Sequence, residues 1–155
     1  MERREFIALL GVATAMMPSG ARADNQHGTK SPGDRLAGAW GFAASVNTRK
    51  DGTTFDRWGE NPQGIFMFEH GHYAQIIIGG ESRVFGSKVY CAFGTYTLDE
   101  AAKILVTRIQ ACSVSKSQGK VQNRSVLRLT ADELKYSNPS TSTGSIAEAL
   151  WKRMG

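Results

Sequence analysis

The chain has 155 residues, with 19 basic and 14 acidic side chains and a formal net charge of +5. The basic residues form no long run and match no nucleic-acid-binding motif, so we expect a mildly basic, solvated surface and no nucleic-acid partner. Beyond the N-terminal segment, the scattered basic residues include Arg49, Lys50, Lys88, Lys103, Arg108, Lys116, Lys120, Arg124, Arg128, Lys152 and Arg153.

Residues 1–23 have the layout of an export signal peptide. Arg3 and Arg4 precede a short, weakly apolar run, and a small-x-small triplet ends at Ala23, where we expect cleavage. The arginine pair resembles the twin-arginine signal, which predicts passage through the twin-arginine export machinery and a periplasmic or secreted protein. An ordinary secretory signal and an uncleaved anchor are the alternatives. The run is far shorter than the roughly 20 apolar residues that span a bilayer, so we expect no stable membrane anchor.

Residues 24–35 are polar and contain Gly and Pro, which predicts a flexible lead-in. Residues 36–154 have the size of a single domain. Leu36 to Val46 predicts the first strand, with Trp40, Phe42 and Ala44 on one face by the two-residue period.

A hairpin follows a turn at Asn61-Pro62-Gln63-Gly64. Two apolar runs are separated by His70-Gly71, a dipeptide that suits a two-residue hairpin loop. This loop fixes the register and pairs Phe68 with Tyr73. The same register pairs Phe66 with Gln75, Gly64 with Ile77, Glu69 with His72, Met67 with Ala74 and Ile65 with Ile76.

Both faces of this hairpin are largely apolar, so either could face the interior. We favour the aromatic face, because Gln75 would need a hydrogen-bond partner in a dry core but suits a pocket. The alternative places Ile65, Met67 and Ile76 inward. The predicted ligand-binding residues are Trp40, Phe66, Phe68, Tyr73 and Gln75.

The remaining chain predicts further strands at hairpin spacing and no long helix. About eight strands suit an all-β, antiparallel up-and-down barrel, which closes on itself and can hold one small ligand. The other predicted strands are 53–57, 88–98, 103–113, 121–129, 134–137 and 147–153.

Cys91 and Cys112 lie in two long predicted strands joined by a short turn. Pairing Leu98 with Leu105 sets the two cysteines directly opposite, at a spacing that suits a disulfide. An exported chain favours a disulfide between them. A one-residue slip would place them on opposite faces and leave two free thiols.

Residues that could carry chemistry are few. His70 and His72 flank a turn glycine beside Glu69, and Asp56 and Glu60 flank Trp58, but we expect all of these to be solvated. No nucleophile elbow and no Gly-rich phosphate loop is present in the sequence. We therefore predict no catalytic residue, no metal site and no cofactor.

Four segments resemble the bacterial lipocalin-like domain family: 38–40 (Gly-Ala-Trp), 58–64 with its Asn-Pro-x-Gly strand opening, 93–99, and 150–153. The resemblance covers roughly residues 36–154. It implies a calycin-type barrel with an internal pocket, whose first Trp plugs the closed end. It implies no particular activity.

Three functions follow from this sequence. We favour an exported protein that binds a small apolar or amphipathic molecule inside the barrel. The alternatives are a barrel enzyme of the isomerase or hydrolase type, and an accessory domain that contacts another exported protein. A large apolar patch on the outer wall would favour the last of these.

Overall fold

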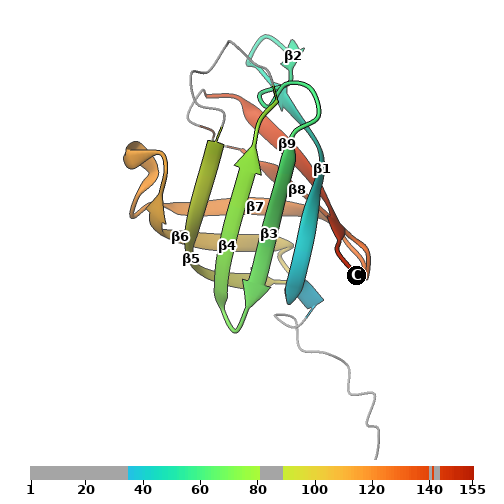
Figure 1. Ribbon diagram of the computed structural model, residues 1–155, viewed down its shortest axis with the longest axis vertical. Helices are drawn as coiled ribbons and strands as arrows, with labels where there is room; N and C mark the ends of the chain where they lie inside the picture. Colours follow the sequence, from blue (N-terminus) through green and yellow to red (C-terminus); the bar gives the residue numbers. More distant parts are fainter. Residues whose placement is uncertain (1–34, 81–88, 140, 142–143) are drawn as a thin grey trace, which may run out of the picture.

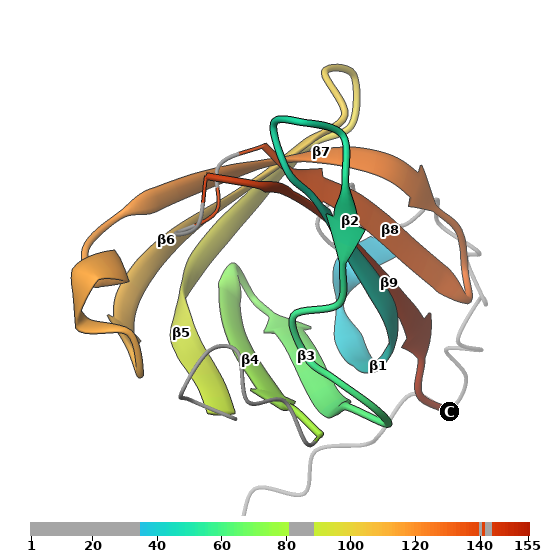
Figure 2. The same ribbon diagram turned by 90° about the horizontal axis from the view of Figure 1, so that it is seen from above.

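The computed structural model describes residues 35–80, 89–139, 141 and 144–155, which form an all-β barrel. The predicted signal peptide and residues 24–34 lie outside the described residues. The strand order is β2-β1-β3-β4-β5-β6-β7-β8-β9, and β1 also pairs with β9. Every pairing is antiparallel, so β1 and β3 to β9 close into an eight-stranded ring, as Figure 2 shows from above. The predicted fold class is confirmed.

The elements follow the predicted hairpin spacing. Within the described ranges, no helix has the length and apolar character needed to cross a membrane. The elements are β1 (Gly38–Thr48), β2 (Thr54–Phe55), β3 (Gln63–Glu69), β4 (His72–Ile78), β5 (Val89–Asp99), β6 (Ile104–Cys112), the 3-10 helix η1 (Ser115–Ser117), β7 (Val121–Leu129), β8 (Glu133–Asn138) and β9 (Ile146–Arg153).

The hairpin of β3 and β4 has the predicted register at every position from Gly64↔Ile77 to Glu69↔His72. His70 and Gly71 form its two-residue loop, and both have positive φ angles, 47° and 78°. Such a loop matches the twist of the strands that it joins, which is why the dipeptide fixes the pairing. β3 and β4 lie side by side at the front of Figure 1.

The aromatic face of this hairpin lies inside the barrel. Phe66, Phe68, Tyr73 and Gln75 are all buried, whereas Met67 is 42% exposed and Ile76 is 39% exposed. The predicted choice of inner face is therefore confirmed.

Trp40 closes the barrel at the end opposite β2. Its side chain is fully buried, and its indole Nε1 donates a hydrogen bond to the Leu36 carbonyl oxygen at 2.8 Å. The Arg153 guanidinium stacks over the indole ring at 4.1 Å and donates to the Ala37 carbonyl oxygen at 2.7 Å. The contact between the Trp40 indole and the Arg153 guanidinium thus joins the start of β1 to the end of β9.

The strand register shifts in β1 between Phe42 and Ala44, where Ala43 forms a β-bulge. A bulge inserts one extra residue, so every later side chain changes face. Trp40 is buried and Phe42 packs against the core, but Ala44 is exposed. The prediction that Ala44 shares their face is wrong for this reason.

A second bulge, at Gln110, is the reason why the predicted disulfide is wrong. Leu98↔Leu105 and Gly94↔Ile109 pair as predicted, but Cys112 lies opposite Ala92 rather than Cys91. Both cysteines are free: Cys91 is exposed, and Cys112 is half-buried. Because Ala92 points inward, Cys112 does too, while Cys91 lies on the outer wall.

Candidate binding pocket

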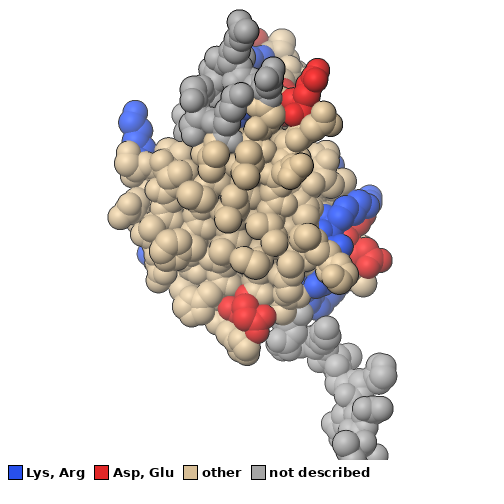
Figure 3. All heavy atoms as spheres, viewed as in Figure 1, with Lys and Arg blue, Asp and Glu red and all other residues tan. Residues whose placement is uncertain are grey.

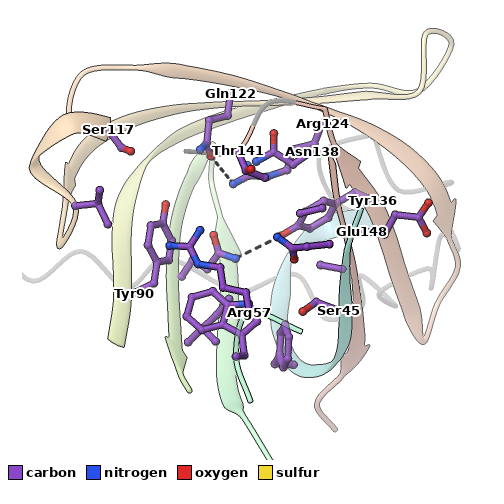
Figure 4. Close-up of a pocket in the computed structure, with 18 residues that line it drawn as sticks. Ser45, Arg57, Tyr90, Ser117, Gln122, Arg124, Tyr136, Asn138, Thr141 and Glu148 are labelled. Carbon is purple, nitrogen blue, oxygen red and sulfur yellow. Dashed lines mark hydrogen bonds between the residues drawn. The ribbon is translucent and has the colours of Figure 1, made fainter. Parts of the chain in front are cut away.

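A pocket of about 110 Å³ lies inside the barrel, toward the end that carries β2 and η1. Figure 4 shows Tyr90 on one side of it, Tyr136 on the other, and Gln122 and Arg124 between them. Its lining residues are Phe42, Ser45, Asn47, Arg57, Trp58, Gln75, Ile77, Tyr90, Val114, Ser117, Gln122, Arg124, Tyr136, Asn138, Thr141, Ala147, Glu148 and Ala149.

The structure divides the five predicted ligand-binding residues into two groups. Gln75 lines this pocket, whereas Trp40, Phe66, Phe68 and Tyr73 do not. These four belong to the main hydrophobic core. The ring of Phe66 lies 4.2 Å from Phe68 and 5.8 Å from Tyr73, centroid to centroid. The aromatic cluster therefore packs the barrel interior between the pocket and Trp40.

Gln75 reaches the pocket because β4 alternates strictly and presents Tyr73, Gln75 and Ile77 inward. The Gln75 side chain is 3% exposed, and its Nε2 donates a hydrogen bond to the Tyr136 hydroxyl oxygen at 3.3 Å. A hydroxyl that accepts one hydrogen bond keeps its own proton to donate. Tyr136 can therefore serve as a donor toward the pocket.

Arg124 is a pocket residue, although its sequence context predicts a place on the solvated surface. It lies on β7, and only 3% of it is exposed. Its Nη1 donates to Thr107 Oγ1 at 2.5 Å, and its Nη2 donates to Gln122 Oε1 at 2.6 Å. Its guanidinium also lies over the Tyr136 ring at 5.1 Å. Because the guanidinium is buried among these neutral partners, the expectation of a solvated Arg124 is wrong.

Arg57 brings a second positive charge to the pocket. It follows β2, at the same end of the barrel as the pocket, and its side chain extends toward Tyr90 (Figure 4). Burial lowers the pKa of Arg57, while the nearby Tyr90 acts in the opposite direction. An arginine stays protonated despite such a shift. Burial also raises the pKa of Tyr90 to about 12, so its hydroxyl keeps its proton at neutral pH.

Two buried polar atoms of the lining have no hydrogen-bond partner among the described residues: Ser45 Oγ and Arg124 Nε. Buried polar groups are normally hydrogen-bonded, and each exception calls for an explanation. Ser45 faces inward because the bulge at Ala43 shifts the alternation of β1. The same bulge that moved Ala44 outward thus brought a hydroxyl into the pocket.

The described lining residues include one acid, Glu148. Its carboxylate pairs with Lys135 Nζ at 2.8 Å, and Figure 4 shows the side chain pointing away from the pocket. The neighbours of Glu148 in β9, Ala147 and Ala149, face inward, so strand alternation places its side chain on the outer wall. The charges that face the pocket from the described lining are therefore positive.

The candidate chemical residues lie elsewhere. His70 Nδ1 lies 2.7 Å from Glu69 Oε1, and both side chains are exposed. Asp56 Oδ1 accepts a hydrogen bond from the Trp58 backbone N–H at 2.8 Å, which stabilises a turn. No group of three or more His, Cys, Asp or Glu residues that could hold a metal occurs in the part of the chain that the structure describes.

The outer wall over β3, β4 and β5 carries a second feature, an apolar face. Figure 3 shows no charged side chain in the middle of this face. Phe93 is 53% exposed there, and Met67 and Ile76 are also exposed. Ala74 lies opposite both Met67 and Phe93 in the sheet, so the side chains form one surface. We call these residues the outer apolar face: Met67, Ala74, Ile76, Ile78, Val89 and Phe93.

Comparison with known proteins gives matches at the level of solved structures. No protein-family model matches the chain, and no curated protein sequence does. A lipocalin-like protein from Bacteroides uniformis is similar to it, with a TM-score of 0.48, 14% identity, and coverage of 77% of this chain and 99% of that one.

Two further structures are similar to the chain. A redesigned β-barrel has a TM-score of 0.48 and 16% identity, with coverage of 80% of this chain and 96% of that one. A bovine odorant-binding protein, in complex with a selenium-containing odorant, has a TM-score of 0.46 and 11% identity, with coverage of 84% and 78%. The assignment of an eight-stranded barrel rests on the strand pairings themselves.

Proposed function

We propose that this chain is an exported, lipocalin-like binding protein that holds a small amphipathic molecule in the pocket inside its barrel. The observation that carries the proposal is the mixed lining. Apolar side chains such as Phe42 and Ile77 and polar side chains such as Gln75 and Tyr136 line the same space. This combination is the usual composition of a small-molecule site.

The volume of the pocket restricts the ligand. About 110 Å³ is somewhat smaller than the roughly 150 Å³ cavity that admits benzene. The part of the ligand that enters the barrel is therefore about the size of one small ring or a short chain. Gln75 and Tyr136 would contact its polar end, and Phe42 and Ile77 its apolar part.

The proposal can be tested with a substitution on β9 that fills the pocket with a larger side chain. Ala147 of β9 lines the pocket, so the phenyl ring of Ala147→Phe would occupy much of its space. The matched control is Ile146→Phe, because Ile146 directly precedes Ala147 on the same strand and is exposed. In calorimetric titrations with benzamide, we expect the wild type and Ile146→Phe to bind equally. We expect Ala147→Phe to bind at least tenfold more weakly.

A wild type that binds neither benzamide nor its carboxylate analogue benzoate, or an Ala147→Phe variant that binds the probe as well as the control does, would contradict the proposal. The function would then lie on the outer surface. The outer apolar face is the specific observation that favours this second candidate, a domain that contacts another protein. The barrel-enzyme alternative has no such observation in the described lining of the pocket.

A further inference from the structure

Arg124 is buried without a counter-ion that the described structure supplies. Its two terminal nitrogens donate to a hydroxyl and an amide oxygen, and its Nε–H has no partner among the described residues. Moving an ionised group out of water has a large desolvation free energy, and hydrogen bonds to neutral partners offset only part of it. A negative charge beside Arg124 would offset more of this desolvation free energy.

Several hydrogen-bond donors in the lining of the pocket could contact such a negative charge. The hydroxyl groups of Tyr90 and Tyr136 could each donate a hydrogen bond to the anion. The carboxylate of Glu148, the acid among the described lining residues, is already paired with Lys135 on the outer wall. The electrostatic field from the described side chains in the pocket therefore favours an anion.

We propose that the ligand is a small organic carboxylate, with its carboxylate against Arg124 and its apolar part against Phe42 and Ile77. This inference rests on the proposed function and adds the chemical class of the ligand. A planar guanidinium matches the geometry of a carboxylate and binds it with charge-assisted hydrogen bonds. The apolar walls distinguish an organic carboxylate from a free inorganic anion.

The experiment compares three probes by calorimetric titration of the folded protein: benzoate, benzamide and inorganic phosphate. Benzoate and benzamide have nearly the same shape and differ in charge. We expect benzoate to bind at least tenfold more tightly than either benzamide or phosphate. Equal affinity for benzoate and benzamide would overturn the inference and leave the proposed function standing. Phosphate binding as tightly as benzoate would also overturn it, and binding of neither aromatic probe would contradict the proposed function.

Two variants and one control test which arginine binds the carboxylate of benzoate. Arg124→Gln should lower the affinity for benzoate at least tenfold and change the affinity for benzamide by less than about threefold. The matched control is Arg128→Gln, because Arg128 lies on the same strand but pairs with Glu133 outside the barrel at 2.9 Å. Arg57→Gln should lower the affinity for benzoate in the same direction by a smaller factor.

If Arg124→Gln does not fold, the wild-type ratio of benzoate to benzamide affinity and the Arg57→Gln variant still decide. A folded Arg124→Gln variant that binds benzoate like the wild type would show that Arg124 only stabilises the barrel.

Discussion

Replacing Trp40 with alanine is expected to destabilise the barrel by about 3–5 kcal/mol, the usual cost of removing a fully buried large aromatic side chain. The change also removes the hydrogen bond to the Leu36 carbonyl and the surface on which Arg153 stacks. Arg153 would keep its hydrogen bond to Ala37 but lose its ring contact. Thermal unfolding followed by circular dichroism should show a Tm lower by on the order of 10–20 °C.

Phe93→Ala is the matched control for this prediction. It also truncates an aromatic side chain on a barrel strand, but Phe93 lies half-exposed on the outer apolar face. We expect a small change in the Tm of this variant. A Trp40→Ala variant that loses no more stability than Phe93→Ala would show that the indole does not close the barrel.

Replacing Gly94 with alanine is expected to cost about 3 kcal/mol or more, since even one methyl group would have no room. A Cβ atom at this position would lie 1.9 Å from the Arg108 carbonyl oxygen, which is backbone and cannot move aside by rotation. Gly94 pairs with Tyr73 and Ile109 beside the bulge at Gln110. The glycine therefore permits the irregularity that separates the two cysteines.

Gly41→Ala supplies the comparison for Gly94→Ala. Its Cβ would have ordinary contacts, the nearest at 3.6 Å to a Met154 side-chain atom. A Gly-to-Ala change at a compatible position stabilises by about 0.4–1 kcal/mol, through the unfolded chain. Urea denaturation should thus give changes of opposite sign in the free energy of unfolding. Similar changes at the two positions would contradict the close approach at Gly94.

The sequence predicts regular pairing well and irregular pairing poorly. His70-Gly71 determines a two-residue loop, and this local signal sets the whole register of β3 and β4. The bulges at Ala43 and Gln110 have no comparable local signal, because an extra residue in one strand depends on its neighbours. The errors at Ala44 and in the cysteine pairing both come from bulges.

The lining of the candidate pocket was predictable only in part. Gln75 stands out as a polar residue on an otherwise aromatic face, and the structure places it in the pocket. Arg124 gives no such signal, because its strand exposes Val121 and Leu127 and places two polar residues, the half-buried Gln122 and the buried Arg124, on its inner side. A charged residue in a strand is normally solvated, so its burial is visible only once the barrel is closed.

Nitrogen-15 NMR spectra of the folded protein during a titration with benzoate test the central claim most directly. They report the Arg Nε–H and Gln side-chain amide signals as well as the backbone amides. We predict that the largest shifts occur at Arg124 Nε–H, at the Gln75 amide and on the pocket segments of β4, β7 and β8. Shifts confined to the outer apolar face around Ile76 and Phe93, or no shifts at the highest benzoate concentration, would contradict a carboxylate-binding site inside the barrel.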